Sequence, residues 1–301
     1  MLRWRLLLGT IFVAALVGLC WLDLQAAKPG QYLLWLAILL VVLASEEVLS
    51  LLAARDFRPL PSVVYGGSLA VLLASYFGIW YPGPLGALGW TAVALAGSLL
   101  AAFTGEMARY REPGKSILGV GLAMFAVTYV GGLFAFLLQL RVLGSDQSLA
   151  RLGEFGIVPL ASLLLVVEFG DTGAYTFGRL FGRHKMTPTL SPGKTWEGAA
   201  GGMAAACLGA WLSQHILLPR TVDLAGLPQS APTWGWLVYG LLVGLAGVLG
   251  DLAESLLKRD MGRKDSSTWM PGFGGVLDLL DSVIFAAPVA YLCWLWHLMG
   301  P

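Results

Sequence analysis

The chain of 301 residues is 57% hydrophobic, only 12% charged, and has a formal net charge of +1. Soluble globular domains usually have about 25% charged residues, so this composition excludes that class and predicts a multi-pass membrane protein. We expect contacts with membrane lipids and none with nucleic acid. The three cysteines, Cys20, Cys207 and Cys293, form no CxxC pair, which argues against a disulfide framework or a zinc site.

Apolar runs of roughly 20 residues, long enough to cross about 30 Å of hydrocarbon, occur about nine times. They lie near residues 6–21, 33–54, 62–80, 85–103, 117–140, 157–181, 196–218, 234–257 and 275–299. The first run follows Arg3 and Arg5 but lacks a small-residue cleavage site, so we interpret it as a retained helix. The predicted fold is all-α, a single transmembrane domain over residues 1–301. Residues 1–150 are expected to form an apolar helical scaffold, and residues 151–301 the half that carries the chemistry.

Lysine and arginine are distributed unevenly between the predicted loops. With a cytoplasmic N-terminus and nine spans, 15 of the 19 basic residues fall on the cytoplasmic side. The remaining four are Lys28, Arg141, Arg151 and Arg220. The positive-inside rule therefore favours this orientation, which places the basic loops 182–195 and 258–274 at the cytoplasmic face.

Three predicted helices carry acidic residues at helical spacing near their cytoplasmic ends. These sets are Glu168, Asp171 and Tyr175; Asp251, Glu254, Ser255 and Lys258; and Asp278 and Asp281. The spacing puts each set on one helix face. A charge at bilayer depth costs about 2.5 to 3.5 kcal/mol, so such acids indicate a functional site. Oxygen ligands suit Mg²⁺, and the absence of clustered histidine or cysteine argues against zinc or copper.

Two other interpretations of these acids stay open. The acids can pair with Lys258, Arg259 and Lys264 in charge networks that hold helices together. They can also form the ion pathway of a transporter. A transporter more often has acids at mid-depth and broken helices in both halves. Here the acids gather at one end and mostly in one half, with Glu46, Glu47 and Glu106 as the exceptions.

The segment 187–198, TPTLSPGKTWEG, contains the GKT of a phosphate loop. Pro188 stands where that motif needs its first glycine, and the flank is a membrane helix, so we reject a Walker A loop. Lys194, Ser191 and Thr195 would still lie at a helix N-terminus, which suits phosphate oxygens. Ser191 or Thr195 can instead be a simple N-cap, which does not exclude phosphate binding.

Two segments resemble the signature of phosphatidate cytidylyltransferases, the membrane enzymes that make CDP-diacylglycerol. In residues 255–281 the resemblance rests on Ser255, Lys258, Arg259, Lys264, Asp265, Pro271, Gly274, Gly275, Asp278 and Asp281. In residues 171–198 it rests on Asp171, Tyr175, Gly178, Ser191, Pro192, Lys194, Thr195 and Glu197. The first half matches only as a set of apolar helices. The sequence departs from the family at Phe273, Leu279 and Met270, where histidine, arginine and a Leu, Ile or Phe are usual.

The resemblance implies the reaction of CTP with phosphatidic acid to give CDP-diacylglycerol and pyrophosphate, in phospholipid biosynthesis. It implies a multi-pass enzyme of the inner (plasma) membrane with its active site at the cytoplasmic face. It also implies Mg²⁺ as cofactor in a two-cation site whose second cation is open. A homodimer is compatible with it.

The resemblance also assigns roles to residues. Asp251 and Asp278 would be the metal ligands, with Asp171, Glu197, Glu254 and Asp281 around them. Lys194, Lys258, Arg259, Lys264 and Asp265 would be catalytic. Tyr175, Ser191, Thr195, Ser255, Gly274 and Gly275 would bind substrate. Alternatives are a CTP-dependent enzyme acting on another lipid phosphate or a polyprenol, an ion-coupled transporter, and a relative that only binds because of Phe273 and Leu279.

Overall fold

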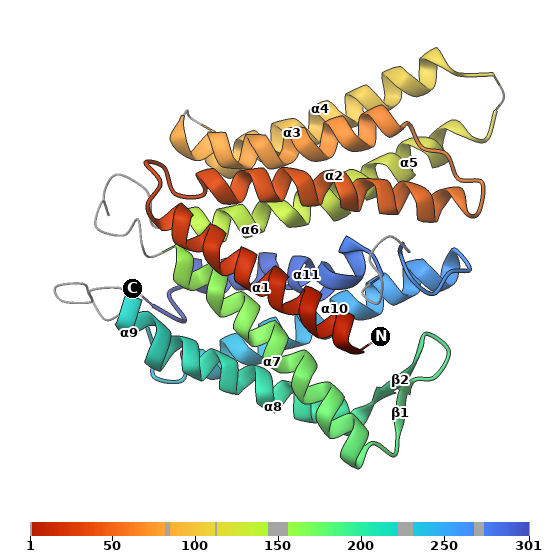
Figure 1. The fold of residues 1–301 in the computed structure, drawn as a ribbon. Helices are drawn as coiled ribbons and strands as arrows, with labels where there is room; N and C mark the ends of the chain where they lie inside the picture. The colour runs from red at the N-terminus through yellow and green to blue at the C-terminus, as the bar shows by residue number, and fades with distance from the viewer. Residues whose placement is uncertain are drawn as a thin grey trace. The chain divides into compact units, whose positions relative to one another are not determined.

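The computed structural model describes residues 2–81, 85–111, 113–143, 156–221, 231–267 and 274–300, with side chains from residue 10 onward except Phe12. The elements in chain order are α1 (Leu2–Leu24), α2 (Gln31–Ala53), α3 (Pro61–Trp80), α4 (Gly86–Ala108), α5 (Ser116–Ala126), η1 (Val127–Gly132), α6 (Leu133–Val142), α7 (Ile157–Phe181), β1 (Lys185–Thr187), β2 (Ser191–Thr195), α8 (Trp196–Leu212), η3 (Ser213–Leu217), α9 (Leu218–Thr221), α10 (Gly235–Asp260) and α11 (Val276–Leu295) (Figure 1).

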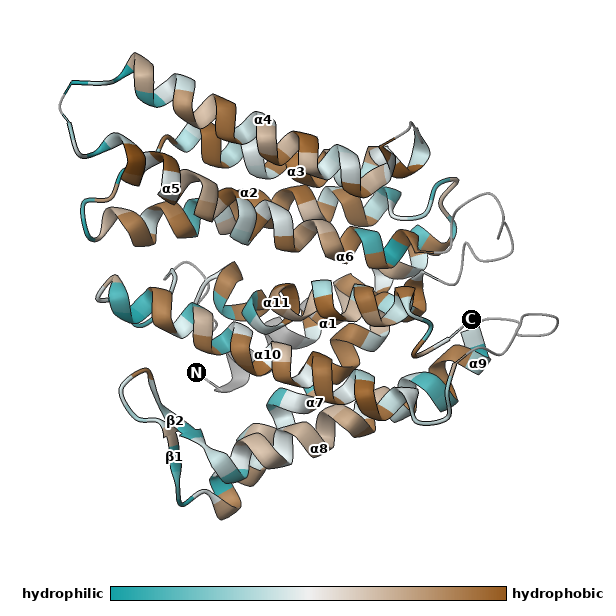
Figure 2. Ribbon diagram, turned by 180° about the vertical axis from the view of Figure 1, so that it is seen from behind, coloured by the Kyte–Doolittle hydropathy of each residue, from teal (hydrophilic) through white to brown (hydrophobic). Residues whose placement is uncertain are grey.

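Eight helices in the described part of the chain are long and apolar enough to cross a membrane. They are Gln31–Ala53, Pro61–Trp80, Gly86–Ala108, Ser116–Val142, Ile157–Phe181, Trp196–Thr221, Gly235–Asp260 and Val276–Leu295. The first predicted span coincides with α1, whose part Val13–Leu24 is a shorter apolar helix. Hydrophobic residues dominate the helices, while the β1–β2 hairpin is largely hydrophilic (Figure 2). The prediction of an all-α, multi-pass membrane protein is confirmed.

Two of the spans contain π-helical segments that the sequence analysis did not predict. Residues Val127–Gly132 continue α5 into α6 as a π-helix, and Ser213–Leu217 link α8 to α9 in the same way. In the first of these, Gly131 packs on the backbone of α3, where a Cβ would lie 2.6 Å from the Cα of Ser68. Only glycine fits such an approach, so a tertiary contact accompanies the local widening of the helix.

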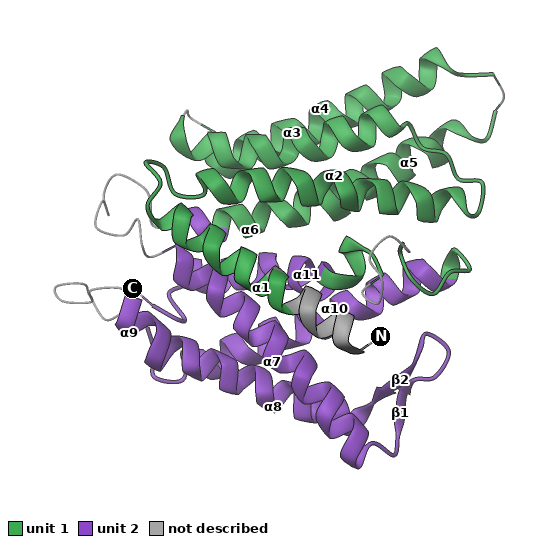
Figure 3. Cartoon of the chain, in the orientation of Figure 1, with its two compact units in different colours: residues 1–139, 260–279 green, residues 140–259, 280–301 purple. Residues whose placement is uncertain are grey.

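The chain divides into two compact units (Figure 3). Unit 1 contains residues 1–139 and 260–279, and unit 2 contains residues 140–259 and 280–301. In unit 1, helices α3 and α4, the π segment η1 and helix α6 share a core in which Val71, Val127 and Ala135 are buried. The segment that follows α10 and the first residues of α11 belong to this unit, although they come late in the sequence.

In unit 2, small residues bring α7 and α8 into close contact. A Cβ on Gly202 would lie 2.9 Å from the Gly170 carbonyl oxygen, and one on Gly209 would lie 3.0 Å from the Leu165 carbonyl oxygen. Close backbone approach at small residues is the usual way in which membrane helices pack. A buried polar cluster ties further helices to this pair, because Ser162 bonds the Tyr239 hydroxyl at 2.8 Å and accepts from the Trp294 indole at 3.1 Å.

Candidate functional site

The predicted Pro-Gly turn between α7 and α8 is a two-stranded antiparallel hairpin. Lys185 pairs with Thr195, and Thr187 pairs with Ser191. Thr195 is the N-cap of α8, because its Oγ1 accepts a hydrogen bond from the Gly198 N–H at 3.1 Å. The N-cap interpretation is therefore confirmed for Thr195, and Lys194 stands beside it as the penultimate residue of β2.

Glu197, in the first turn of α8, holds the start of this hairpin. Its Oε2 accepts from the backbone N–H groups of Arg183 at 3.1 Å and His184 at 3.2 Å. Its Oε1 lies 2.5 Å from Nδ1 of His184. Both carboxylate oxygens are thus used within the hairpin, and a metal-binding role for Glu197 stays a prediction.

A cavity of about 430 Å³ in unit 2 collects predicted site residues from α7, β2 and α10. Those that line it are Asp171, Tyr175, Ser191, Lys194, Thr195 and Asp251. Within it, Lys194 Nζ and Asp251 Oδ2 are 2.8 Å apart. The Asp171 carboxylate interacts electrostatically with Asp251 and with Lys194. The cavity therefore offers cationic and anionic groups side by side on residues up to 80 positions apart in sequence.

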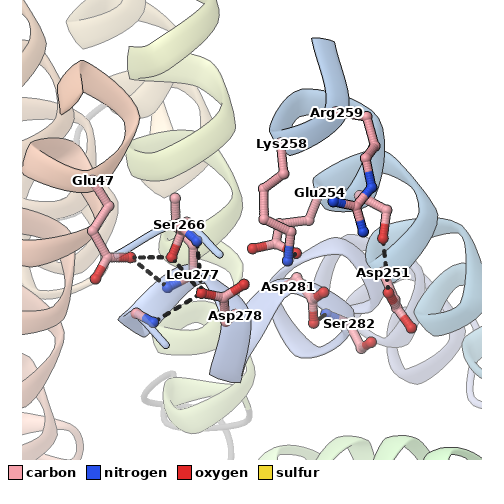
Figure 4. A network of polar contacts seen from close by, with 12 residues as sticks. Glu47, Asp251, Glu254, Lys258, Arg259, Ser266, Leu277, Asp278, Asp281 and Ser282 are labelled. Carbon is pink, nitrogen blue, oxygen red and sulfur yellow. Dashed lines mark hydrogen bonds and ion pairs between the residues drawn. The ribbon is translucent and has the colours of Figure 1, made fainter. Parts of the chain in front are cut away.

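The polar face predicted on α10 exists and is internally paired. Ser255 Oγ donates to Asp251 Oδ1 at 3.4 Å. Glu254, whose residue is 1% exposed, forms an ion pair with Lys258 (Figure 4). Arg259 donates from Nε to the Leu190 carbonyl in the hairpin turn at 3.3 Å. This bond places the hairpin and the basic end of α10 at the same end of unit 2.

Asp281 of α11 joins the charged groups of unit 2 through close helix packing. A Cβ on Gly250 would lie 2.6 Å from the Asp281 carbonyl oxygen, so this glycine allows the two backbones to meet next to Asp251. The Asp281 carboxylate interacts electrostatically with Asp251, Lys258 and Asp171. Unit 2 thus brings together three of the predicted metal-binding aspartates.

Asp278 lies in unit 1, where it accepts several hydrogen bonds. Its Oδ2 accepts from the backbone N–H of Ser266 at 2.8 Å, from Ser266 Oγ at 2.7 Å and from the Gly275 N–H at 2.8 Å. Gly274 has a positive φ of 84°, and a Cβ there would collide with this carboxylate. The two glycines therefore shape the turn around Asp278, while the predicted catalytic residues Lys264 and Asp265 are exposed.

The sharing of one metal ion by Asp251 and Asp278 stays a prediction, because these aspartates belong to different units. Within the described residues, no group of three or more His, Cys, Asp or Glu side chains is arranged to hold a metal ion. Met270, Pro271 and Phe273 lie outside the described residues. Leu279, which replaces the arginine usual in the signature, lies in the first turn of α11 and is 40% exposed.

A family model described as the Cytidylyltransferase family matches residues 3–296, nearly the whole chain. This chain belongs to the cytidylyltransferase family. The match includes the first half, where the sequence analysis found only apolar helices.

Three relatives of this cytidylyltransferase illustrate the similarity, and all three are bacterial proteins. A protein named phosphatidate cytidylyltransferase from Staphylococcus saprophyticus is 30% identical over 263 residues, which cover 87% of this chain and 89% of the relative. One of the same name from Staphylococcus epidermidis is 31% identical over 265 residues, with the same coverage. One from Brucella suis is 40% identical over 155 residues, 52% of this chain and 51% of the relative.

The sequence analysis gave no role to Glu47 on α2 of this cytidylyltransferase and noted it only as an acid outside the main acidic sets. Its residue is 3% exposed. Oε1 accepts from the Val276 N–H at 2.7 Å, and Oε2 accepts from the Leu277 N–H at 2.8 Å and from Ser266 Oγ at 3.1 Å (Figure 4). Glu47 therefore caps the N-terminus of α11 with a carboxylate, which complements the helix dipole.

Glu47 and Asp278 share a hydrogen-bonding partner, Ser266. The Ser266 hydroxyl lies within bonding distance of both carboxylates, and it has one proton to donate. The arrangement holds the turn before α11 and with it the position of Asp278. The only signal in the sequence was a pair of adjacent acids, Glu46 and Glu47, inside an apolar span.

We expect Glu47→Gln to lower the free energy of unfolding by about 1–3 kcal/mol, because its amide turns a donor toward a buried N–H group. Glu46→Gln is the matched control. Glu46 is exposed and pairs with the Tyr65 hydroxyl, so the same charge change there should leave stability nearly unaffected. The midpoint of thermal unfolding in detergent, monitored by size-exclusion chromatography, is measured for both variants. Equal midpoints for Glu47→Gln and the unmodified protein would contradict the capping role.

Proposed function

We propose that this cytidylyltransferase transfers the cytidylyl group of CTP to phosphatidic acid, giving CDP-diacylglycerol and pyrophosphate. The observation that carries the proposal is the similarity to phosphatidate cytidylyltransferases that covers 87% of this chain and 89% of the relatives. The cavity of unit 2 supports it, because Lys194, Asp171 and Asp251 line one space next to the basic end of α10.

The reaction needs little general acid–base catalysis. An oxygen of the lipid phosphate, ionised at neutral pH, bonds to the α-phosphorus of CTP, and the bond from that phosphorus to the bridging oxygen of the β-phosphate breaks. Pyrophosphate leaves with the electron pair. The protein must bring two polyanions together, align them and neutralise their charge. We assign Lys194, Lys258 and Arg259 to the triphosphate and to the departing pyrophosphate, with Ser191 and Tyr175 contacting substrate from the cavity wall.

The carboxylates of this chain fit a hard divalent cation by their chemistry. Asp171, Asp251 and Asp281 in unit 2 and Asp278 in unit 1 supply only oxygen donors, the kind that Mg²⁺ prefers. We assign Asp171, Asp251 and Asp281 of unit 2 to this ion, with Glu254 near Asp251 on the same helix. A metal-binding role for Asp278 of unit 1 is a separate prediction. A bound Mg²⁺ would neutralise phosphate charge and help to align the reacting groups.

The two substrates indicate where the active site lies relative to the membrane. CTP is dissolved in the cytoplasm and phosphatidic acid lies in the bilayer, so the site must open at the cytoplasmic interface of the plasma membrane. The hydrogen bond from Arg259 to Leu190 supports this location, because it joins two basic segments at one end of unit 2. The excess of basic residues in these loops favours the cytoplasmic side.

The purified protein in detergent should convert phosphatidic acid to CDP-diacylglycerol only when CTP and Mg²⁺ are both present. Thin-layer chromatography of labelled product measures the conversion. A polyprenol and an ether-linked lipid phosphate serve as competing acceptors. Faster turnover with either of them would overturn phosphatidic acid as the substrate. Activity that appears only after Phe273→His or Leu279→Arg would show that these positions limit the native chain.

A further inference from the structure

A second polar cavity lies in unit 1. It is lined by residues 56–58 after α2, by residues 106 and 109–111 at the end of α4 and just after it, and by residues between 115 and 122 at the start of α5. Its volume is about 410 Å³. Among the described residues, the charged ones that line it are Asp56, Arg58, Glu106, Arg109, Arg111 and Lys115, four positive and two negative. None of them is among the residues assigned above to the reaction. The described lining therefore has more basic than acidic side chains, and the proposed function does not use it.

One of these cations, Arg109, is held in place by the α2–α3 loop and by helix α4. Arg109 donates from Nη2 to the Arg58 carbonyl at 3.1 Å and forms an ion pair with Glu106. Glu106 is only 7% exposed, so this pair fixes the guanidinium against the cavity wall. Arg58 itself lies 3.7 Å from Asp56 with both side chains largely exposed, a contact of small energy. The cavity is thus preorganised around Arg109.

The N-terminus of α5 faces the same space. Helix α5 begins at Ser116, and the residue before it, Lys115, makes no side-chain capping bond. Ser116, Leu118 and Gly119 line the cavity. A Cβ on Gly119 would collide with Glu106 Oε1 and lie 3.2 Å from Arg109 Nη2, so this first turn packs closely against the Glu106–Arg109 ion pair. Backbone N–H groups and the positive end of a helix dipole add to the attraction for a phosphate.

An apolar cleft adjoins the basic cavity. It is lined by Phe103, Met107, Ile117 and Val120, and it shares Glu106, Tyr110 and Ser116 with the cavity. Ile117 is 86% exposed and Met107 is 68% exposed, as expected of side chains that meet lipid. A ligand that fits both spaces must have an anionic head and an apolar tail.

We propose that unit 1 binds an anionic phospholipid, with its headgroup phosphate among Arg109, Arg111 and Lys115 and an acyl chain along the α4–α5 cleft. The positive-inside rule accounts for basic loops in general, but not for their convergence on one cavity with a helix N-terminus and an apolar extension. Basic pockets between membrane helices are a known means of binding lipid headgroups. The inference does not depend on which reaction the protein catalyses.

Native mass spectrometry of the full chain in detergent, titrated with phosphatidylglycerol and without CTP, tests the proposal. We expect the double variant Arg111→Gln/Lys115→Gln to bind about 30-fold more weakly, since each basic side chain near an anionic group contributes a factor of about five. Arg55→Gln/Lys185→Gln removes the same charge from exposed residues that do not line the cavity, and should bind like the unmodified chain. Equal binding by all three proteins would overturn the proposal.

Two further titrations identify the part of the ligand that is recognised. Glycerol 3-phosphate carries the anionic head without acyl chains, and we expect it to bind at least 100-fold more weakly than the lipid because it cannot fill the apolar cleft. Equal affinity would show a site for soluble phosphate and overturn the assignment to a lipid. Met107→Ser/Ile117→Ser should weaken phosphatidylglycerol binding and leave glycerol 3-phosphate binding unchanged.

Discussion

Asp278→Asn is expected to lower the turnover of phosphatidic acid about 1,000-fold or more while the protein stays folded. Asparagine can keep its side-chain oxygen toward Ser266 and Gly275, which donate three hydrogen bonds to Asp278 Oδ2. The charge is lost, however, and with it the contribution of a carboxylate to a transition state dominated by phosphate charge. Stability should fall only by about 1–2 kcal/mol, because charge-assisted bonds become neutral ones.

The control for this variant is Asp260→Asn. Asp260 is an exposed aspartate at the end of α10, in the same unit as Asp278, and no role is assigned to it. Steady-state rates with saturating CTP and phosphatidic acid, measured beside the thermal midpoint, separate catalysis from folding. A fully active Asp278→Asn protein would remove this aspartate from the proposed site. If Asp278→Asn does not fold, the role of Asp278 is structural. In that case Asp278→Glu should also not fold.

Asp251→Asn is expected to abolish most of the activity. Because Asp251 forms an ion pair with Lys194, a structural role and a catalytic role of this aspartate can be tested against each other. The two charged atoms are 2.8 Å apart, and their side chains are 38% and 21% exposed. A pair of this exposure contributes at most about 1 kcal/mol to stability, so the variant should remain folded. The functional hypothesis gives Asp251 to the metal and Lys194 to the triphosphate, and predicts a fall in rate of about 1,000-fold.

The double variant Asp251→Asn/Lys194→Gln distinguishes catalysis from a charge network that merely holds helices together. If the pair is structural, the double variant removes both charges at once and should recover much of the stability and activity lost in either single variant. If the residues act on the substrates, it should be no more active than Asp251→Asn. Recovery of more than about a tenth of the native rate in the double variant would refute the assignment of both residues.

The sequence determined the features that depend on local composition and periodicity. Runs of apolar side chains long enough for the bilayer define the membrane helices, because the cost of leaving them in water is set residue by residue. Helical spacing put Asp251, Ser255 and Lys258 on one face of α10, and the hydroxyl bond from Ser255 to Asp251 agrees with it. The resemblance of two late segments to cytidylyltransferases also required only the order of residues.

The tertiary structure alone decided which distant residues meet. Glu47 caps a helix that begins 229 positions later, and no local pattern distinguishes it from its neighbour Glu46. The first π segment and the hairpin each contact a distant element, as Gly131 on Ser68 and Arg259 on Leu190 show. Each feature rests on a contact between segments far apart in the chain, and such contacts depend on how the whole chain packs.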